Sequence, residues 1–264
     1  IINNNRRCVV SVLRLKDGSY QIDFEETEKL ITENKVKMLL FCSPHNPVGR
    51  VWEKAELQRL SEICLKHRVL IVSDEIHSDF VFGSNRHIPL ATLSAEIAEQ
   101  TITCTAPSKT FNLAGLQVSN LVITNPEIKA KVQEICTARS YHGLNTMAAA
   151  AAEAAYRYGE PWLEAMLEYL ESNISLLQNS LQGTDLISLI PPQGTYLLWL
   201  DCRKLCLDDR QLKKFFADEA GIWIHSGSTF GLGGSGFVRL NIACPKAILQ
   251  KAADRLQEAL RKNF

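Results

Sequence analysis

The chain has 264 residues, 46% of them hydrophobic, which is enough to bury a large core in one large or two smaller domains. Lysine plus arginine equals aspartate plus glutamate at 29 each, so the formal net charge is zero. This balance lacks the basic footprint of a nucleic-acid-binding protein. No apolar run reaches the roughly 18–20 residues that a membrane-spanning helix needs. We therefore expect neither a nucleic-acid nor a membrane partner.

The N-terminus and the cysteines bear on the origin and the compartment of the chain. Residues 1–7 form no signal peptide, because no apolar segment follows their basic residues, and an initiator methionine is missing. We expect the chain to begin inside a longer protein. The eight cysteines are scattered without a paired CxxC array, and the closest two, Cys202 and Cys206, have no histidine nearby. We expect inert thiols, no metal site and a cytoplasmic location.

Short apolar runs alternate with a helical pattern in the first half of the chain. The helical pattern covers 53–67, where Leu57, Leu60 and Ile63 recur at helical spacing. Strands are expected at 8–13, 37–42, 69–73, 101–105 and 121–124. Strands separated by helices predict an α/β fold with a largely parallel sheet.

The second half begins with two predicted helices, at 145–158 and 161–181. A smaller α+β unit follows. Its expected strands are 186–190, 196–201, 223–225 and 236–241. Its expected helices are 209–220 and 245–261. The pattern predicts a large domain at 1–160, an interdomain helix at 161–182 and a small C-terminal domain at 183–264.

Three polar residues, Asn46, Asp74 and Lys109, each come at or shortly after the end of an expected strand. In open α/β sheets ligands bind outside the carboxyl ends of the strands, so these side chains are expected to share one pocket. Arg239 follows much later, in the strand at 236–241. An amide, a carboxylate, a lysine and an arginine are the groups needed to hold pyridoxal phosphate and an amino acid.

Each of the four residues has a predicted task. Lys109 forms a Schiff base with the cofactor aldehyde and, once the substrate displaces it, moves the α-proton. Asp74 keeps the pyridine nitrogen protonated, so that the ring draws electrons from the α-carbon. Asn46 donates to the ring oxygen. Arg239 binds the substrate α-carboxylate through its two parallel donors.

Other residues near these motifs have weaker predictions. His77 is expected to stack on the ring or hydrogen-bond near it, and direct catalysis is the less favoured role. The hydroxyls of Ser108, Thr110 and Thr105 bind either the phosphate or local backbone. The glycine-rich loop at 227–236 lacks the ending of a P-loop and the spacing of a dinucleotide site, so we interpret it as a mobile loop near the substrate.

The chain resembles the fold-type I pyridoxal-phosphate enzymes of the class I/II aminotransferase superfamily. Within that group it is most similar to the cystathionine β-lyase branch, the MalY/PatB C–S lyases. The motifs that carry the resemblance are PHNPVG at 44–49, DEIHSD at 74–79 and APSKTFNLAG at 106–115. Typical aminotransferases carry tyrosine where His77 stands. The resemblance implies an aspartate aminotransferase-like fold, with a three-layer α/β/α large domain and a smaller α+β C-terminal domain.

The resemblance also implies a homodimer acting on a small amino-acid substrate, with the same roles for Lys109, Asp74, Asn46 and Arg239. Two departures stand out. Many aminotransferases have a phosphate-binding arginine where this chain has Gln117. The family also has roughly a further third of its length before this chain begins, with a phosphate loop, an aromatic residue over the ring and part of the dimer interface.

Three functions remain open at this point. The first is α,β-elimination on a sulfur amino acid such as cystathionine, which releases a thiol, pyruvate and ammonia. The second is transamination, which shares every step up to removal of the α-proton. The third is an inactive fragment or an interaction module. The lyase-like motifs favour elimination.

Overall fold

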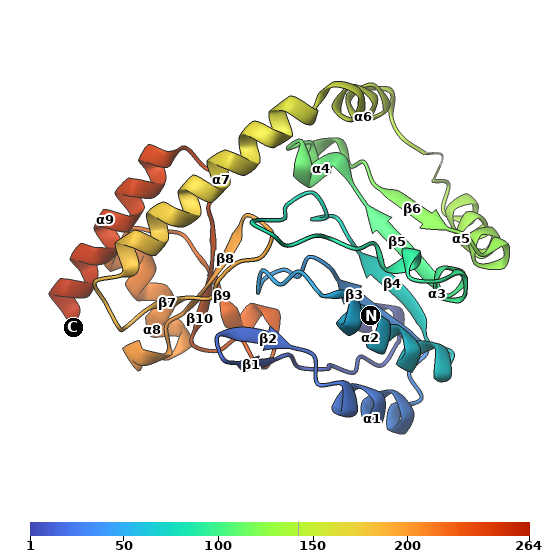
Figure 1. Cartoon of the computed structure of the whole chain (residues 1–264), viewed down its shortest axis with the longest axis horizontal. Helices are drawn as coiled ribbons and strands as arrows, with labels where there is room; N and C mark the ends of the chain where they lie inside the picture. The colour runs from blue at the N-terminus through green and yellow to red at the C-terminus, as the bar shows by residue number, and fades with distance from the viewer. Residues whose placement is uncertain (142) are drawn as a thin grey trace.

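The computed structural model describes residues 1–141 and 143–264. Its described strands form two four-stranded sheets and one two-stranded hairpin. Figure 1 shows the β3–β6 sheet in the right half of the molecule and the β7–β10 sheet in the left half. The long helix α7 (Glu160–Leu181) passes from the side of the first sheet to the second. Within the described residues, no helix is both long and apolar enough to cross a bilayer.

The first sheet has the strand order β3-β4-β5-β6. Its strands are β3 (Met38–Cys42), β4 (Leu70–Asp74), β5 (Thr101–Thr105) and β6 (Asn120–Ile123). β3, β4 and β5 are parallel, whereas β6 pairs with β5 in the antiparallel sense. The expected largely parallel α/β sheet is therefore confirmed.

One face of this sheet is covered by helices from the first hundred residues. They are α1 (Phe24–Asn34), α2 (Lys54–Lys66) and α3 (Ala95–Glu99). α2 matches the predicted helix, and its side chains pack with Phe41 of β3 and Ile71 of β4 in one apolar cluster. On the other face of β3, Met38 and Leu40 are 50% and 57% exposed. The described helices thus leave part of that face open.

Three further helices follow β5 and β6. They are α4 (Pro107–Thr110), α5 (Pro126–Ala138) and α6 (Thr146–Tyr158). Asparagine side chains begin two of them, because Asn125 accepts from two backbone N–H groups of α5 and Asn145 accepts from one of α6. α6 agrees with the helix predicted at 145–158, whereas α1, α3 and α5 were not predicted.

The second sheet has the order β7-β8-β10-β9 and is antiparallel throughout. Its strands are β7 (Ser188–Leu189), β8 (Leu197–Asp201), β9 (His225–Ser226) and β10 (Phe237–Asn241). Helices α7 and α9 (Lys246–Asn263) lie side by side (Figure 1) and pack on one face of this sheet. Buried Leu198, Leu200 and Val238 contribute to that core.

The expected strand at 8–13 is wrong. Those residues are in no described strand, and Val10 is 55% exposed. A hairpin of β1 (Arg14–Lys16) and β2 (Ser19–Gln21) lies directly after them. Its turn has φ of 51° at Asp17 and 77° at Gly18, the conformation that an Asp-Gly pair favours between two strands. The Asp-Gly pair was the signal that the sequence analysis missed.

The helix predicted at 209–220 is divided. α8 (Asp209–Lys214) starts with a capping box between Asp208 and Gln211, and a π-helical turn, η5 (Phe215–Glu219), continues it. Short 3-10 turns connect other elements: η1 (Ile2–Asn4), η2 (Leu90–Thr92), η3 (Ala114–Leu116), η4 (Arg203–Leu205) and η6 (Gly227–Phe230).

Candidate active site

Asp74 is the last residue of β4 and lies at the carboxyl edge of the first sheet. It is in register with Cys42 of β3 and Cys104 of β5. Asn46 follows β3, and Lys109 follows β5 on the short helix α4. Because parallel strands end at the same edge, the fold places all three segments at that edge, as the sequence analysis expected.

Arg239 comes from the other sheet. It lies in the middle of β10, paired with Trp199 of β8 and His225 of β9. Its Nη1 donates to Asn46 Oδ1 at 2.8 Å, and its guanidinium lies 4.7 Å from the centre of the Phe230 ring. Burial lowers the pKa of Arg239, and the nearby Tyr196 phenol opposes that shift. This hydrogen bond connects the two halves of the predicted site.

The hydrogen bond to Arg239 determines what Asn46 can offer to a ligand. Its side-chain oxygen accepts from Arg239, so the amide nitrogen is the atom left as a donor. Asp74 Oδ1 accepts a weak hydrogen bond from the backbone of Ile76 at 3.3 Å. The buried Arg239 Nε has no hydrogen-bond partner within the described residues. The site therefore presents an amide donor, a carboxylate and a guanidinium.

His77 is buried between the two halves. It is 2% exposed, and its ring packs edge-on against Tyr196 at 5.5 Å between centroids and in a tilted arrangement against Phe80 at 6.0 Å. Burial, together with the charges of Lys109 and Arg239, lowers the pKa of His77 to about 4. His77 is therefore neutral at pH 7, and both cations lie close enough to affect it.

The hydroxyls around Lys109 have different surroundings. Ser108 and Lys109 are half-buried. Thr110 is buried, and its hydroxyl donates to Asp79 Oδ2 at 2.6 Å. Thr105 Oγ1 accepts from Asn120 Nδ2 at 3.3 Å. The hydroxyls of Thr105 and Thr110 thus have partners inside the protein. Because the Thr110 hydroxyl donates its proton to Asp79, the local interpretation is favoured over phosphate binding for Thr110.

A second contact between the halves involves residues outside the set of predicted site residues. The Gly49 carbonyl accepts from the backbone N–H groups of Gln193 and Gly194, at 2.8 and 3.0 Å. Gln193 Oε1 accepts from Arg50 Nη1 and the Val51 backbone, at 3.1 and 3.0 Å. This docking fixes the loop that carries Asn46. No sequence signal indicated this contact.

The glycine-rich loop at 227–236 lies beside Arg239 through Phe230. Gly227 and Gly234 pack so closely that a Cβ on either residue would overlap the backbone of the other. Asp209 Oδ1 accepts from the Ser235 hydroxyl and the Gly236 backbone, at 3.1 and 3.0 Å. The loop is thus held at the edge of the site by contacts that only glycine permits.

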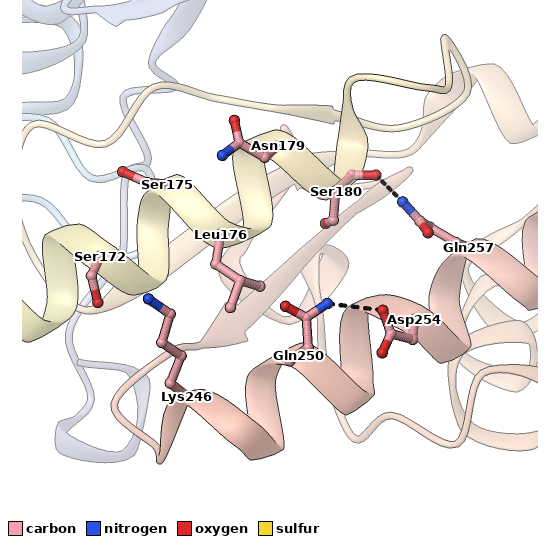
Figure 2. A pocket seen from close by; sticks show the side chains of 9 residues that line it. All are labelled: Ser172, Ser175, Leu176, Asn179, Ser180, Lys246, Gln250, Asp254 and Gln257. Carbon is pink, nitrogen blue, oxygen red and sulfur yellow. Dashed lines mark hydrogen bonds between the residues drawn. The ribbon is translucent and has the colours of Figure 1, made fainter.

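A separate groove of about 570 Å³ lies between α7 and α9 (Figure 2). Gln250 donates to Asp254 along α9, and Gln257 of α9 donates across to the Ser180 carbonyl of α7. Its lining is mostly polar: Ser172, Ser175, Leu176, Asn179, Ser180, Lys246, Gln250, Asp254 and Gln257. The predicted site residues are not among them, so this groove is distinct from the candidate active site.

Comparison with known proteins shows the family. The family described as "Aminotransferase class I and II" matches residues 1–256. Cystathionine beta-lyase PatB of Bacillus subtilis is 40% identical over 259 residues, which cover 97% of this chain and 67% of PatB. Protein MalY of Escherichia coli is 34% identical, with 98% of this chain and 67% of MalY covered.

A solved structure is also similar to this chain over nearly its whole length. Cystalysin from Treponema denticola, which contains a pyridoxal 5'-phosphate cofactor, superposes with a TM-score of 0.96 at 38% identity, covering 99% of this chain and 67% of cystalysin. This chain belongs to the class I and II aminotransferase family, and its fold is that of the pyridoxal-phosphate-dependent aminotransferases. It spans about two thirds (67%) of the length of these relatives.

Proposed function

We propose that this chain belongs to a pyridoxal-phosphate-dependent C–S β-lyase of the cystathionine β-lyase type. The observation that carries the proposal is the 2.8 Å hydrogen bond from Arg239 to Asn46, which brings a carboxylate-binding group to the sheet edge that bears Asp74 and Lys109. The names of PatB and cystalysin support the same reaction class and cofactor.

The donor set fits pyridoxal phosphate. Lys109 offers an amine for the aldehyde, Asp74 a carboxylate for the ring nitrogen, and Asn46 a free amide N–H for the ring oxygen. Ser108, adjacent to Lys109 and half-buried, offers a hydroxyl for the phosphate. His77, whose buried Nδ1 has no hydrogen-bond partner among the described residues, completes the cofactor side of the site.

Pyridoxal phosphate, when bound, supplies an electron sink that makes the α-proton of an amino acid acidic. The protein supplies the rest. Arg239 binds the substrate α-carboxylate and Asn46 orients the guanidinium through Oδ1. The Lys109 amine, freed by the substrate, removes the α-proton. Neutral His77 adds no positive charge beside that amine.

Elimination needs no strong acid in this site. A thiol has a pKa near roughly 8.5, so a thiolate is a good leaving group from the β-carbon. Removal of the α-proton by Lys109 is followed by cleavage of the C–S bond. Overall, cystathionine and water give homocysteine, pyruvate and ammonia.

Two assays test the proposal. Pyridoxal phosphate is added to the protein, borohydride is used to fix any covalent attachment, and peptide masses locate it. Attachment at Lys109 supports the cofactor and its lysine. Pyruvate is then measured from cystathionine without a keto-acid acceptor. Attachment elsewhere contradicts the site, and pyruvate that depends on 2-oxoglutarate contradicts elimination.

Transamination is the second candidate, because the family is described as that of the class I and II aminotransferases. It uses the same residues until the α-proton is removed. It then requires that proton to return to the cofactor rather than loss of a β-substituent. Dependence of product formation on 2-oxoglutarate distinguishes it. A chain that forms no attachment at Lys109 in the presence of excess cofactor favours the third candidate, an inactive fragment or interaction module.

The assembly, compartment and domain division are part of the same proposal. Exposed apolar side chains on α6, including Met147 at 70% and Tyr158 at 75%, support a homodimer interface. Separate apolar cores on the two sheets support a large domain at 1–160, an interdomain helix at 161–182 and a small domain at 183–264. We also propose a cytoplasmic location. Light scattering after size exclusion tests the dimer.

A further inference from the structure

Lys109, on which the proposed function depends, sits on a very short helix. α4 has four residues, and its N-cap residue Ala106 makes no side-chain hydrogen bond. A single turn is not stable by itself, because the cost of forming the first turn is not recovered by further turns. The position of Lys109 is therefore set by the contacts that α4 makes with the rest of the chain.

The residue after Lys109 makes one such contact. Thr110 is 1% exposed, and its hydroxyl donates to Asp79 Oδ2 at 2.6 Å. Hydrogen bonds between a hydroxyl and a carboxylate at this distance are among the stronger ones in proteins. Thr110 is buried while Asp79 is exposed, so the contact joins the inner side of α4 to a residue at the surface.

Asp79 is part of a firmly held turn. Next to it, Phe80 is fully buried, its backbone N–H donates to the His77 carbonyl at 2.9 Å, and its own carbonyl accepts from Thr195 at 3.0 Å. The segment that carries Asp79 begins at Asp74, at the end of β4. The hydrogen bond from Thr110 therefore connects the lysine segment with the segment that bears Asp74 and His77.

Backbone pairing alone does not make this connection. The β4–β5 register ends at the pair Asp74–Cys104, and Lys109 lies five residues beyond Cys104. We propose that Asp79 and Thr110 are positioning residues, which set the place of the Lys109 amine relative to Asp74. The inference rests on the proposed function and adds two residues that act through Lys109 without contacting the substrate.

Thr110 offers a matched pair of variants. Thr110→Val keeps the size of the side chain and removes the hydroxyl, whereas Thr110→Ser keeps the hydroxyl. The rate of pyridoxal-phosphate attachment to Lys109 is measured by borohydride quenching and peptide mass, and the free energy of unfolding is measured on the same samples. We expect Thr110→Val to slow attachment on the order of tenfold, since a displacement of about 1 Å can cost up to about 100-fold. We expect Thr110→Ser to match the wild type.

Asp79 offers the second pair. Asp79→Ala removes the acceptor, and Asp79→Asn retains an oxygen that can accept from Thr110. We expect Asp79→Ala to slow attachment as much as Thr110→Val does, and Asp79→Asn to be closer to the wild type. Because the two side chains act through one hydrogen bond, the double variant Asp79→Ala with Thr110→Val should be no slower than either single variant.

Each result decides between the proposals. Slower attachment in Thr110→Val and Asp79→Ala, with rescue by Thr110→Ser, supports the positioning role when the unfolding measurements show these samples to be fully folded, because a loss of stability that leaves the chain folded does not by itself slow the reaction of Lys109. Equal attachment rates in wild type and Thr110→Val overturn the positioning role and leave the proposed function intact. No attachment to wild-type Lys109 overturns the proposed function and the positioning role together.

Discussion

Lys109 and Arg239 are held in place by different kinds of structure. Arg239 lies mid-strand in β10, where backbone pairing with β8 and β9 fixes it from both sides. Lys109 lies on a four-residue helix, held by side-chain contacts such as that of Thr110 with Asp79. A backbone ladder tolerates many side-chain changes, whereas a short turn depends on particular neighbours. The position of Arg239 is therefore expected to tolerate substitutions of neighbouring side chains better than the position of the Lys109 amine.

Removal of the Lys109 amine has the largest expected effect. In Lys109→Ala, attachment of pyridoxal phosphate should fall to background and elimination should fall by at least about 10³-fold, because the nucleophile itself is lost. Borohydride reduction with peptide mass and a pyruvate assay measure both. Lys129→Ala on α5 is the control, since Lys129 is exposed. Attachment that persists in Lys109→Ala would place the reactive amine elsewhere.

Replacement of the anchor should have a smaller effect. Arg239→Lys keeps the charge but loses the planar pair of donors, so KM for cystathionine should rise by about 10–100-fold. The attachment rate at Lys109 should change little, because β10 remains paired. Arg157→Lys on α6, where Arg157 forms an exposed ion pair with Glu153, is the control. An unchanged KM in Arg239→Lys contradicts the anchoring role.

The packing behind Lys109 can be tested through Gly159, where α6 meets α7. A methyl group on Gly159 would overlap the Phe111 ring, directly after α4, and the Ala155 carbonyl. Gly159→Ala should therefore lower the free energy of unfolding by about 1–3 kcal/mol and slow attachment at Lys109. Gly183→Ala is the control, because no described atom outside its two chain neighbours lies within 4 Å of its new methyl group. Urea unfolding compares them, and equal stabilities would show that the Phe111 contact is easily relaxed.

A further prediction concerns the charges near His77. The pKa of His77 is about 4 because of burial and the charges of Lys109 and Arg239, whereas the pKa of His45 is about 4 because of burial alone. In Lys109→Ala or Arg239→Gln, the pKa of His77 should rise by a fraction of a unit, and that of His45 should not change. NMR titration of the ring protons measures both. A matching shift at His45 would indicate a general structural change instead.

The same histidines predict how stability depends on pH. Both have a folded-state pKa below the unfolded value near 6.5, so the unfolded chain binds more protons between these values. The free energy of unfolding should therefore fall as pH decreases from about 6.5 to about 4. His45→Gln should make this fall smaller, by roughly 1–2 kcal/mol between pH 7 and pH 5. An unchanged slope contradicts the burial of a neutral His45.

The sequence determined the parts of the fold that depend on local pattern. The strands β3, β4 and β5 and the helices α2, α6 and α7 were predicted because apolar residues recur at strand or helix spacing over their whole length. The hairpin β1–β2 was missed because its strands have only three residues each and its Asp-Gly turn was not used. The strand at 8–13 was predicted from its apolar residues alone. An apolar run forms a strand only where another strand pairs with it.

The candidate site also has one part that the sequence predicted and another that only the tertiary structure decided. Asn46, Asp74 and Lys109 were predicted to converge because parallel strands end at one edge, a rule that follows from chain order alone. The tertiary structure alone decided that Arg239 reaches Asn46, that Gln193 docks on Gly49, and that Thr110 binds Asp79. These are contacts between residues far apart in the sequence, and their partners are selected by how the two sheets and the short helix pack, which no local pattern encodes.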